Sequence, residues 1–368
     1  SEDYINPLGI AMGQCTMCGF CERFGCANYS KSSAQTTVLP VLMKKKNFEL
    51  RTHSEVLHVD LDASRTHARG VTYVDTSGEE FFQPADMVLL CAYGLHNVRL
   101  MMLSGIGEAY DPNTGEGTVG RNYCYQTNSG AQVFFDDKNF NPFVAAGALG
   151  QTMDDFNGDA FDHGGLDFVG GAGINCIPTN GRPIQTRPTR PGTPRWGKDW
   201  KQATVDSYKS TLSFSAQGSS YPTRGNYLDL DPTYKDRFGR PLLRVTFDFQ
   251  DNDIRMASWV AGKMEGIAKE LGGRQYTVSP RKKGWDSVPY QSTHNTGGAT
   301  MGTDPRTSAV NKYLQSWDVP NVFVVGASAF AHNAGKNPTG TVGALAYHAA
   351  DAIRQQYLRN PGQSLVSA

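Results

Sequence analysis

A buried strand followed by a glycine turn and a helix restricts the fold of this chain more than any other feature. Residues 321–330 have the sequence NVFVVGASAF. The apolar run NVFVV has the length of a buried strand, and Gly326 follows it where the chain is expected to turn. Residues 337–353, NPTGTVGALAYHAADAI, then have the composition of a helix. This order predicts an α/β fold. A helix that begins after a glycine-rich turn also suits a phosphate or an electron-rich cofactor edge.

The first third of the chain has the same α/β character. Residues 48–60, FELRTHSEVLHVD, alternate apolar and polar side chains as a strand does. A buried strand is predicted over 87–91, and a short helix over 94–107 that is ended by Gly105 and Gly107.

The middle of the chain, residues 123–290, differs in composition. It contains long proline-rich loops such as 177–197 and strands such as 240–250. One clear helix is predicted over 252–272, where apolar residues recur at helical spacing up to a glycine pair. This part is predicted to be a second domain with a mainly antiparallel sheet.

Charge and hydropathy exclude several classes of protein. Lys plus Arg and Asp plus Glu both total 35, so nothing indicates a nucleic-acid partner or an electrostatic membrane anchor. No apolar run reaches the roughly 18–20 residues that span a bilayer. The start, SEDYINPLGI, has neither an initiating Met nor a signal-peptide pattern, so we expect a processed or partial chain.

Four cysteines lie within twelve residues, as Cys15-x2-Cys18-x2-Cys21-x4-Cys26. Such a run can converge on one inorganic cluster, as iron–sulfur proteins show. Zinc sites usually have two separated pairs, and disulfides between cysteines three apart are strained, so both alternatives are weaker but stay open. Either three or four thiols bind, which leaves 3Fe–4S and 4Fe–4S open, with 3Fe–4S preferred.

The other three cysteines, Cys91, Cys124 and Cys176, are scattered. Cys91 falls in a predicted buried strand, where a thiol is usually a small core residue.

Three stretches carry a family resemblance: DMVLLCAYGLHNVRLMMLSGIG, THNTGGATMG, and NVFVVGASAF with NPTGTVGALAYHAADAI. They resemble the glucose–methanol–choline (GMC) oxidoreductases, which are flavoproteins. With the cysteine run added, the chain is similar to the large flavoprotein subunits of bacterial membrane-associated dehydrogenases of the gluconate 2-dehydrogenase and fructose dehydrogenase type.

The resemblance implies an α/β (α+β) fold that is the C-terminal part of a GMC flavoprotein, with a Rossmann-like FAD-binding portion and a substrate domain. The implied ranges are an iron–sulfur loop at 1–35, parts of the FAD-binding domain at 36–122 and 291–368, and the substrate domain at 123–290. The family's G-x-G-x-x-G fingerprint after a first strand is not found here, which implies a longer chain.

Two residues are implied to be catalytic. His294 lies between small residues in STHNTGG, which leaves room for a close approach, and it matches the family's general base. A histidine in a loop is by itself more often structural, so this role rests on the resemblance. Asn337 matches the second active-site position; it can hydrogen-bond a substrate oxygen but cannot act as a base.

Further residues are implied to contact FAD. Gly326 and Ala327 end the strand over 321–325 and would offer backbone contacts, and Val56 matches a strand position beside the adenine. Asn337 is included here, and Pro338 and Thr339 would orient the start of the last helix against the isoalloxazine ring.

The resulting hypothesis is an FAD-dependent dehydrogenase acting on a CH–OH group of a sugar acid, sugar or polyol, with D-gluconate to 2-keto-D-gluconate as the best guess. Electrons would pass through the iron–sulfur cluster to a cytochrome c subunit and a quinone. A small subunit would complete a heterotrimer on the periplasmic face of the inner membrane. A fructose or sorbitol dehydrogenase large subunit, and an electron-transfer module without substrate chemistry, are the alternatives.

Overall fold

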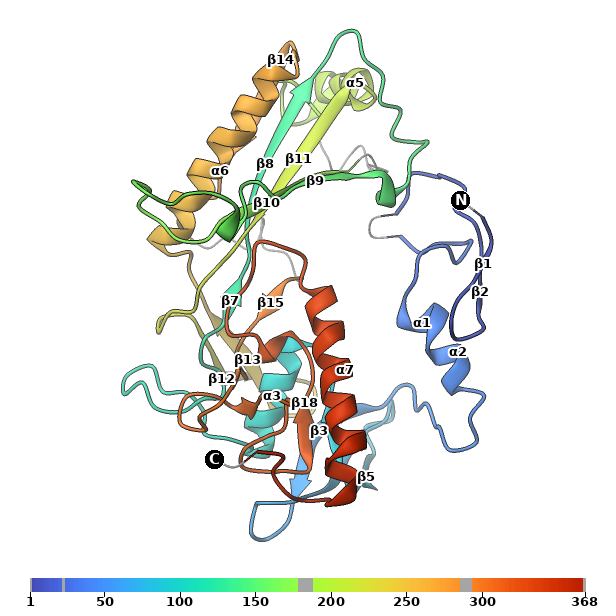
Figure 1. Cartoon of the computed structure of the whole chain (residues 1–368), viewed down its shortest axis with the longest axis vertical. Helices are drawn as coiled ribbons and strands as arrows, with labels where there is room; N and C mark the ends of the chain where they lie inside the picture. The colour runs from blue at the N-terminus through green and yellow to red at the C-terminus, as the bar shows by residue number, and fades with distance from the viewer. Residues whose placement is uncertain (1, 22–23, 178–187, 285–292, 367–368) are drawn as a thin grey trace. The chain divides into compact units, whose positions relative to one another are not determined.

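A computed structural model describes residues 2–21, 24–177, 188–284 and 293–366 (Figure 1). The chain forms two compact units that interleave along the sequence. Unit 1 comprises Ser1–Thr52, Asn128–Gln217 and Arg255–Arg281, and unit 2 comprises His53–Thr127, Gly218–Ile254 and Lys282–Ala368. Each unit is described by itself.

Unit 2 is built on a parallel strand pair. Strands β6 (Val88–Leu90) and β18 (Val322–Val324) pair in register. A short turn joins β6 to its helix, whereas a 3-10 turn and a loop separate β18 from the helix that begins at Thr339. The helices are α3 (Gly94–Ser104) and α7 (Thr339–Gln355), as Figure 1 shows beside β18. The predicted order of strand, turn and helix is therefore confirmed for both. The prediction that Cys91 is a small core residue is wrong, because Cys91 follows β6 and is exposed.

Helix α3 ends where the sequence predicts. Its C-terminal cap, Gly105, has a left-handed φ of 65°, which glycine adopts without strain. The hydroxyl of Ser104 accepts a hydrogen bond from the Val59 N–H at 2.8 Å, which joins the helix to the strand β3.

An antiparallel sheet follows the order β3 (Glu55–Leu61), β4 (Ala68–Val74), β5 (Glu80–Pro84). The strand predicted over 48–60 is thus confirmed only in its second half. The remaining regular elements of unit 2 are the hairpin β12 (Tyr227–Lys235) and β13 (Pro241–Thr246), the short strands β7 (Cys124–Tyr125), β15 (Asn295–Thr296), β16 (Met301–Gly302) and β17 (Val310–Asn311), and the 3-10 turns η3 (Ala327–Ala329) and η4 (Tyr357–Arg359).

A five-stranded sheet with the order β14-β8-β11-β10-β9 forms the core of unit 1, and its β14–β8 and β10–β9 pairs are antiparallel. Helix α6 (Asp251–Glu270) runs along it (Figure 1) and buries Met256, Val260 and Met264 against strand residues such as Val133 and Ile174. The predicted helix over 252–272 is confirmed. The strands are β8 (Thr127–Phe134), β9 (Gln151–Met153), β10 (Ala172–Cys176), β11 (Thr211–Gly218) and β14 (Gln275–Ser279).

The other elements of unit 1 are short, apart from one helix that was not predicted from the sequence, α5 (Gly197–Tyr208). They are β1 (Tyr4–Ile5), β2 (Ala11–Met12), α1 (Ala34–Thr37), α2 (Leu39–Leu42), η1 (Gly147–Leu149) and η2 (Gly158–Ala160). Throughout the part of the chain that the structure describes, no helix is both long and apolar enough to span a bilayer.

The buried side chain of Asn321 joins three segments of unit 2. Its Oδ1 accepts a hydrogen bond from the Ala68 N–H at 2.8 Å, and its Nδ2 donates to the carbonyls of Ala68 (2.7 Å) and Asp86 (3.1 Å). These contacts link β4 to the residues that precede β6 and β18. One side-chain amide therefore supplies hydrogen bonds to the backbone of both Ala68 and Asp86.

We predict that Asn321→Ala lowers the free energy of unfolding by about 2–4 kcal/mol, because it leaves the buried Ala68 N–H without an acceptor. The matched control is Asn113→Ala in an exposed turn, expected to change it by less than about 0.5 kcal/mol. Urea unfolding of both variants measures the difference, and equal midpoints would contradict the role given to Asn321.

Candidate active site

His294 is held at both its backbone and its ring. Its φ of 63° lies in the left-handed region, and its carbonyl accepts a hydrogen bond from Asn333 Nδ2 at 2.6 Å. The ring nitrogen Nδ1 lies 2.6 Å from Oε1 of Gln126. His294 as a whole is half-buried.

A short antiparallel ladder sets this geometry. The strands β7 (Cys124–Tyr125) and β15 (Asn295–Thr296) pair so that the last residue of β7 faces the first of β15. Continuing this register by one residue places Gln126 opposite His294, and cross-strand neighbours lie close enough for their side chains to meet.

The glycine pair after His294 allows the two segments to approach closely. Gly297 has a φ of 79°, and a Cβ there would lie 1.9 Å from the carbonyl oxygen of Asn122. Beyond it, the Gly298 N–H donates to Arg121 O at 3.0 Å and the Gly120 N–H donates to Gly298 O at 2.6 Å. Backbone of Asn122 fills the space left at Gly297, and the side chains of Val98 and Leu228 fill the space left at Gly298.

The second predicted catalytic residue, Asn337, is exposed. It directly follows residues 334–336, whose backbone is hydrogen-bonded by the Gln126 side chain. The Gln126 amide nitrogen donates to Ala334 O at 2.7 Å and to Lys336 O at 3.0 Å. His294 and the residue before Asn337 are thus bound by the same side chain.

Pro338 and Thr339 begin α7, as predicted. Pro338 is the N-terminal cap, and no side chain caps the helix. The first backbone N–H groups of such a helix carry partial positive charge and can face an electron-rich ligand.

Gly326 and Ala327 lie at the carboxyl end of β18, where Gly326 has a φ of 142°. Asn97, which is fully buried in α3, donates through Nδ2 to Val325 O at 3.1 Å and to Ser328 Oγ at 3.3 Å. The turn after β18 is thereby fastened to α3. The carboxyl ends of parallel strands are where open α/β sheets bind ligands.

Gly94, the first residue of α3, packs close to the turn after β18. A Cβ at Gly94 would lie 3.5 Å from both Asn295 O and Ser328 N. The start of α3, the turn after β18 and the strand that follows His294 therefore meet in unit 2. Val56 does not join them, since it lies in β3, paired with Tyr73 and 37% exposed.

Burial sets the protonation of this region. It lowers the pKa of His294 from the ordinary imidazole value, since an imidazolium would lose hydration. It also raises the pKa of Asp253 to about 6 and that of the neighbouring Cys124 thiol to about 12. His294 is therefore neutral and Cys124 is a protonated thiol at neutral pH.

The cysteine run lies in unit 1 and packs on one neighbouring segment. The Gly19 N–H donates to Ala145 O at 2.8 Å, and the Ala145 N–H donates to Met17 O at 2.9 Å. A Cβ at Gly19 would lie 2.3 Å from Pro142 O, so only glycine permits this approach.

Three of the four sulfurs have backbone N–H neighbours. Gly147 N donates to Cys21 Sγ at 3.1 Å and Met17 N to Cys15 Sγ at 3.3 Å. Backbone N–H groups, that of Lys31 foremost, lower the pKa of the Cys26 thiol. These donors stabilise thiolates, which are the form that binds metal.

The four thiols do not meet at one centre in the structure. Among the described residues no three His, Cys, Asp or Glu side chains are grouped as a metal site, and no cysteine forms a disulfide. Glu22 and Arg23, inside the run, lie outside the described residues. Four thiols are chemically suited to bind a metal cluster, but in this structure their sulfur atoms are not arranged around a common centre.

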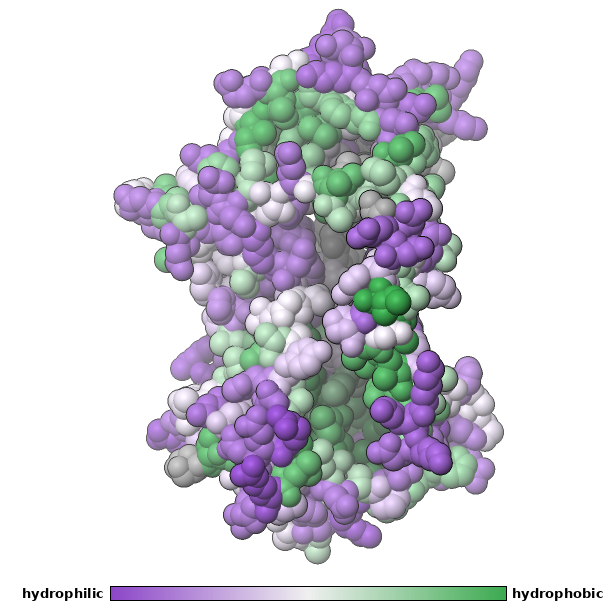
Figure 2. Space-filling view, turned by 45° about the vertical axis from the view of Figure 1, so that its right-hand side comes forward, coloured by the Kyte–Doolittle hydropathy of each residue, from purple (hydrophilic) through white to green (hydrophobic). Residues whose placement is uncertain are grey.

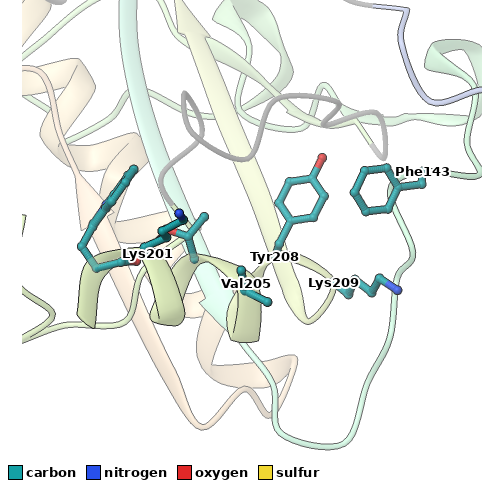
Figure 3. A pocket seen from close by; sticks show the side chains of 7 residues that line it. Phe143, Lys201, Val205, Tyr208 and Lys209 are labelled. Atoms are coloured by element: carbon teal, nitrogen blue, oxygen red, sulfur yellow. Dashed lines mark hydrogen bonds between the residues drawn. The ribbon is translucent and has the colours of Figure 1, made fainter. Parts of the chain in front are cut away.

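A cavity of about 360 Å³ in unit 1 is a different kind of site (Figure 3). Its wall is mostly apolar and comes from α5, from Lys209 directly after it and from one aromatic residue elsewhere: Phe143, Trp200, Lys201, Thr204, Val205, Tyr208 and Lys209. It contains neither a carboxylate nor an imidazole, so it offers no general base.

Apolar side chains also reach the surface elsewhere, as the green areas of Figure 2 show. The outward Tyr347 of α7 is 78% exposed and Leu89 of β6 is 44% exposed. Both belong to the elements that surround the candidate site in unit 2.

Gln126 and Asn333 were not predicted from the sequence to be site residues. Neither has a local signal, because each meets His294 only through folding, across 168 and 39 residues respectively.

Two family models, both described as GMC oxidoreductase, match the chain: the N-terminal model over residues 7–128 and the C-terminal model over residues 222–346. The gluconate 2-dehydrogenase flavoprotein of Pantoea cypripedii is 50% identical over 98% of this chain and 59% of that relative. The fructose dehydrogenase large subunit of Gluconobacter japonicus is 36% identical over 36% of this chain and 23% of that relative.

Solved structures agree on the fold. A formate oxidase from Aspergillus oryzae superposes with a TM-score of 0.60 at 14% identity, over 88% of this chain and 64% of that one. The chain spans 59% of the first curated relative, so those proteins contain more residues than the chain described here.

We predict that the His294 imidazole titrates below its ordinary pKa of about 6.5. Because the unfolded chain binds this proton more readily, the contribution to stability is lost as the pH falls through that range. Histidine NMR, with the signal assigned by its loss in His294→Asn, measures the midpoint. A midpoint at or above the ordinary value would contradict the burial of this ring.

Proposed function

The chain belongs to the GMC oxidoreductase family, and from this premise we propose that it is the flavoprotein part of an FAD-dependent dehydrogenase that oxidises a hydroxyl group of a sugar acid. The substrate proposed first is D-gluconate, oxidised at C2 to 2-keto-D-gluconate. The name and 50% identity of the Pantoea relative support this choice.

The imidazole of His294 is the observation that carries the proposal. It is half-buried, its pKa is lowered by burial, and hydrogen bonds hold its ring and its carbonyl. A neutral, fixed imidazole is the group that a hydroxyl oxidation needs, because a proton must leave oxygen as a hydride leaves carbon.

Oxidation of the hydroxyl group removes one proton from oxygen and one hydride from carbon. His294 takes the proton from the substrate hydroxyl while the C–H bond on the same carbon breaks, and the C=O bond of the product forms. FAD, when bound, supplies the two-electron acceptor for that hydride. Asn337 would hydrogen-bond the substrate oxygen and keep it near His294.

The arrangement in unit 2 fits a flavin. The helices α3 and α7 both begin without a side-chain cap, and the turn at Gly326 and Ala327 follows a parallel strand. Backbone groups of this kind suit the electron-rich edge of a cofactor. We propose that Gly326, Ala327, Asn337, Pro338 and Thr339 contact FAD.

The assignment of ranges remains part of the proposal. Residues 36–122 and 291–368 would bind FAD, with Val56 beside the adenine, and residues 123–290 would form the substrate domain. We place the dinucleotide fingerprint in the longer protein, since residues 1–368 do not contain it in the required strand–turn–helix context.

We propose that Cys15, Cys18, Cys21 and Cys26 in residues 1–35 hold an iron–sulfur cluster, with 3Fe–4S preferred over 4Fe–4S. Their spacing and the N–H groups at Cys15, Cys21 and Cys26 support this, since hydrogen bonds to sulfur tune such clusters. A cluster, when bound, supplies a one-electron exit for reducing equivalents.

A one-electron exit suits a haem partner. We therefore propose a cytochrome c subunit, a small subunit and a membrane quinone as partners, on the periplasmic face of the inner membrane. A fructose or other polyol dehydrogenase is the second candidate, which the 36% identity to the Gluconobacter subunit supports.

We predict that His294→Asn in the full-length enzyme keeps FAD bound but slows flavin reduction by substrate at least about 10²-fold, because it removes the base. Asparagine tolerates the left-handed backbone there. The matched control is His53→Asn, at an exposed histidine with a φ of 56°, expected to react at the wild-type rate.

Stopped-flow absorbance of the flavin measures both variants, and Asn337→Ala is expected to react faster than His294→Asn. Wild-type flavin reduction in His294→Asn would exclude this residue as the base.

We predict that Cys18→Ser loses iron and the broad visible absorbance of a cluster, because it removes a thiolate ligand. Flavin reduction by substrate should persist, while electron delivery to the physiological acceptor falls at least about 10-fold. Cys176→Ser, outside the run, is the control. Normal iron content and acceptor reduction in Cys18→Ser would favour a structural role for the run.

A further inference from the structure

Gln126 is a completely buried residue, and its side-chain amide contacts both parts of the candidate site: His294 on one side and the carbonyls of Ala334 and Lys336 on the other. A buried amide has two donors and one acceptor to satisfy, and leaving any of them without a partner costs free energy. Which end of the amide faces His294 therefore matters for the chemistry of that ring.

The two backbone carbonyls decide the orientation of the amide. Ala334 O and Lys336 O lie 2.7 and 3.0 Å from one end of the Gln126 side chain. Carbonyl oxygens only accept hydrogen bonds, so this end must be the NH₂ group. The other end is then the carbonyl oxygen Oε1, and this oxygen faces His294.

The orientation of the amide in turn decides the tautomer of the imidazole. Oε1 accepts and cannot donate, and it lies 2.6 Å from His294 Nδ1. Nδ1 must therefore carry the proton. A neutral imidazole has one N–H and one lone pair, so the lone pair is left on Nε2.

We propose that Gln126 is a positioning residue that holds the His294 imidazole as the Nδ1–H tautomer and directs the Nε2 lone pair to the substrate hydroxyl. This inference rests on the proposed function of His294 as the base. It names the atom that receives the proton: the hydroxyl proton moves to Nε2, and His294 becomes a cation whose Nδ1–H remains bound to Oε1.

A neutral amide suits this role better than a carboxylate would. A carboxylate at this position would favour the imidazolium and raise the pKa of His294. It would also face Ala334 O and Lys336 O with an acceptor in place of a donor. The glutamine therefore orients the ring and leaves it uncharged.

The same amide connects the two halves of the site. By binding Lys336 O it fixes the backbone immediately before Asn337, and by binding Nδ1 it fixes the ring of His294. One side chain thus determines the relative position of the base and the proposed oxygen-binding residue.

The test is the tautomer itself, measured in the full-length, FAD-bound protein without substrate. Two-bond nitrogen–proton NMR spectra of protein with isotope-labelled histidine distinguish the two tautomers at about pH 8, above the ordinary imidazole pKa. His163 is an internal reference, since its Nε2 lies 2.8 Å from Gly170 O and must carry the proton there.

The wild-type protein should show His294 as Nδ1–H and His163 as Nε2–H. Gln126→Leu should convert His294 to a mixture of tautomers and leave His163 unchanged. Gln126→Glu keeps an acceptor at Nδ1 and should retain the Nδ1–H form. An Nε2–H ring at His294 in the wild type, or an unchanged Nδ1–H form in Gln126→Leu, would overturn the proposal.

Activity provides a second readout. Gln126→Leu should slow flavin reduction at saturating substrate about 10-fold or more. The reason is that the Nε2 lone pair of His294 is then no longer aligned with the substrate hydroxyl. An unchanged rate in Gln126→Leu would overturn the positioning role. If His294→Asn reduces flavin normally, the proposed function fails, while the tautomer measurement, which needs no turnover, still answers for Gln126 by itself.

Discussion

The close antiparallel contact between residues 120–126 and 294–298 is the constraint on which the candidate site depends. It forms because Gly297 has no Cβ to meet the carbonyl of Asn122, and its register places Gln126 beneath His294. A single slipped residue would turn the glutamine to the other face of the ladder. The glycine pair of THNTGG thus acts on His294 indirectly, through the register of its strand.

The residues proposed for two kinds of chemistry lie in two different units of this chain. The imidazole, the uncapped helix starts and the turn after β18 belong to unit 2, whereas the four thiols of the cysteine run belong to unit 1. Each set has its own backbone support, from the parallel pair β6–β18 in one case and from residues 142–147 in the other. The proposed hydride chemistry and the proposed metal binding can therefore be tested separately by mutation.

Much of the fold was predictable because its signals are local. Apolar runs predicted β6 and β18, helical spacing predicted α6, and Gly105 predicted the end of α3. The helix α5 was not predicted, since its sequence GKDWKQATVDSY has few apolar residues and follows a proline-rich loop. His294 and Asn337 were suggested by resemblance, but Gln126 was not, because its partners lie 168 and 210 residues away.

The central claim is that a hydride leaves the carbon whose hydroxyl proton His294 accepts. Anaerobic mixing of the full-length, FAD-bound enzyme with D-gluconate, unlabelled or carrying deuterium at C2, tests it directly. The account predicts that gluconate bleaches the flavin and that deuterium slows the bleaching several-fold, since the C–H bond breaks in that step. A flavin that no sugar acid or polyol bleaches would contradict it, and bleaching that deuterium at the oxidised carbon does not slow would contradict the proposed chemical step.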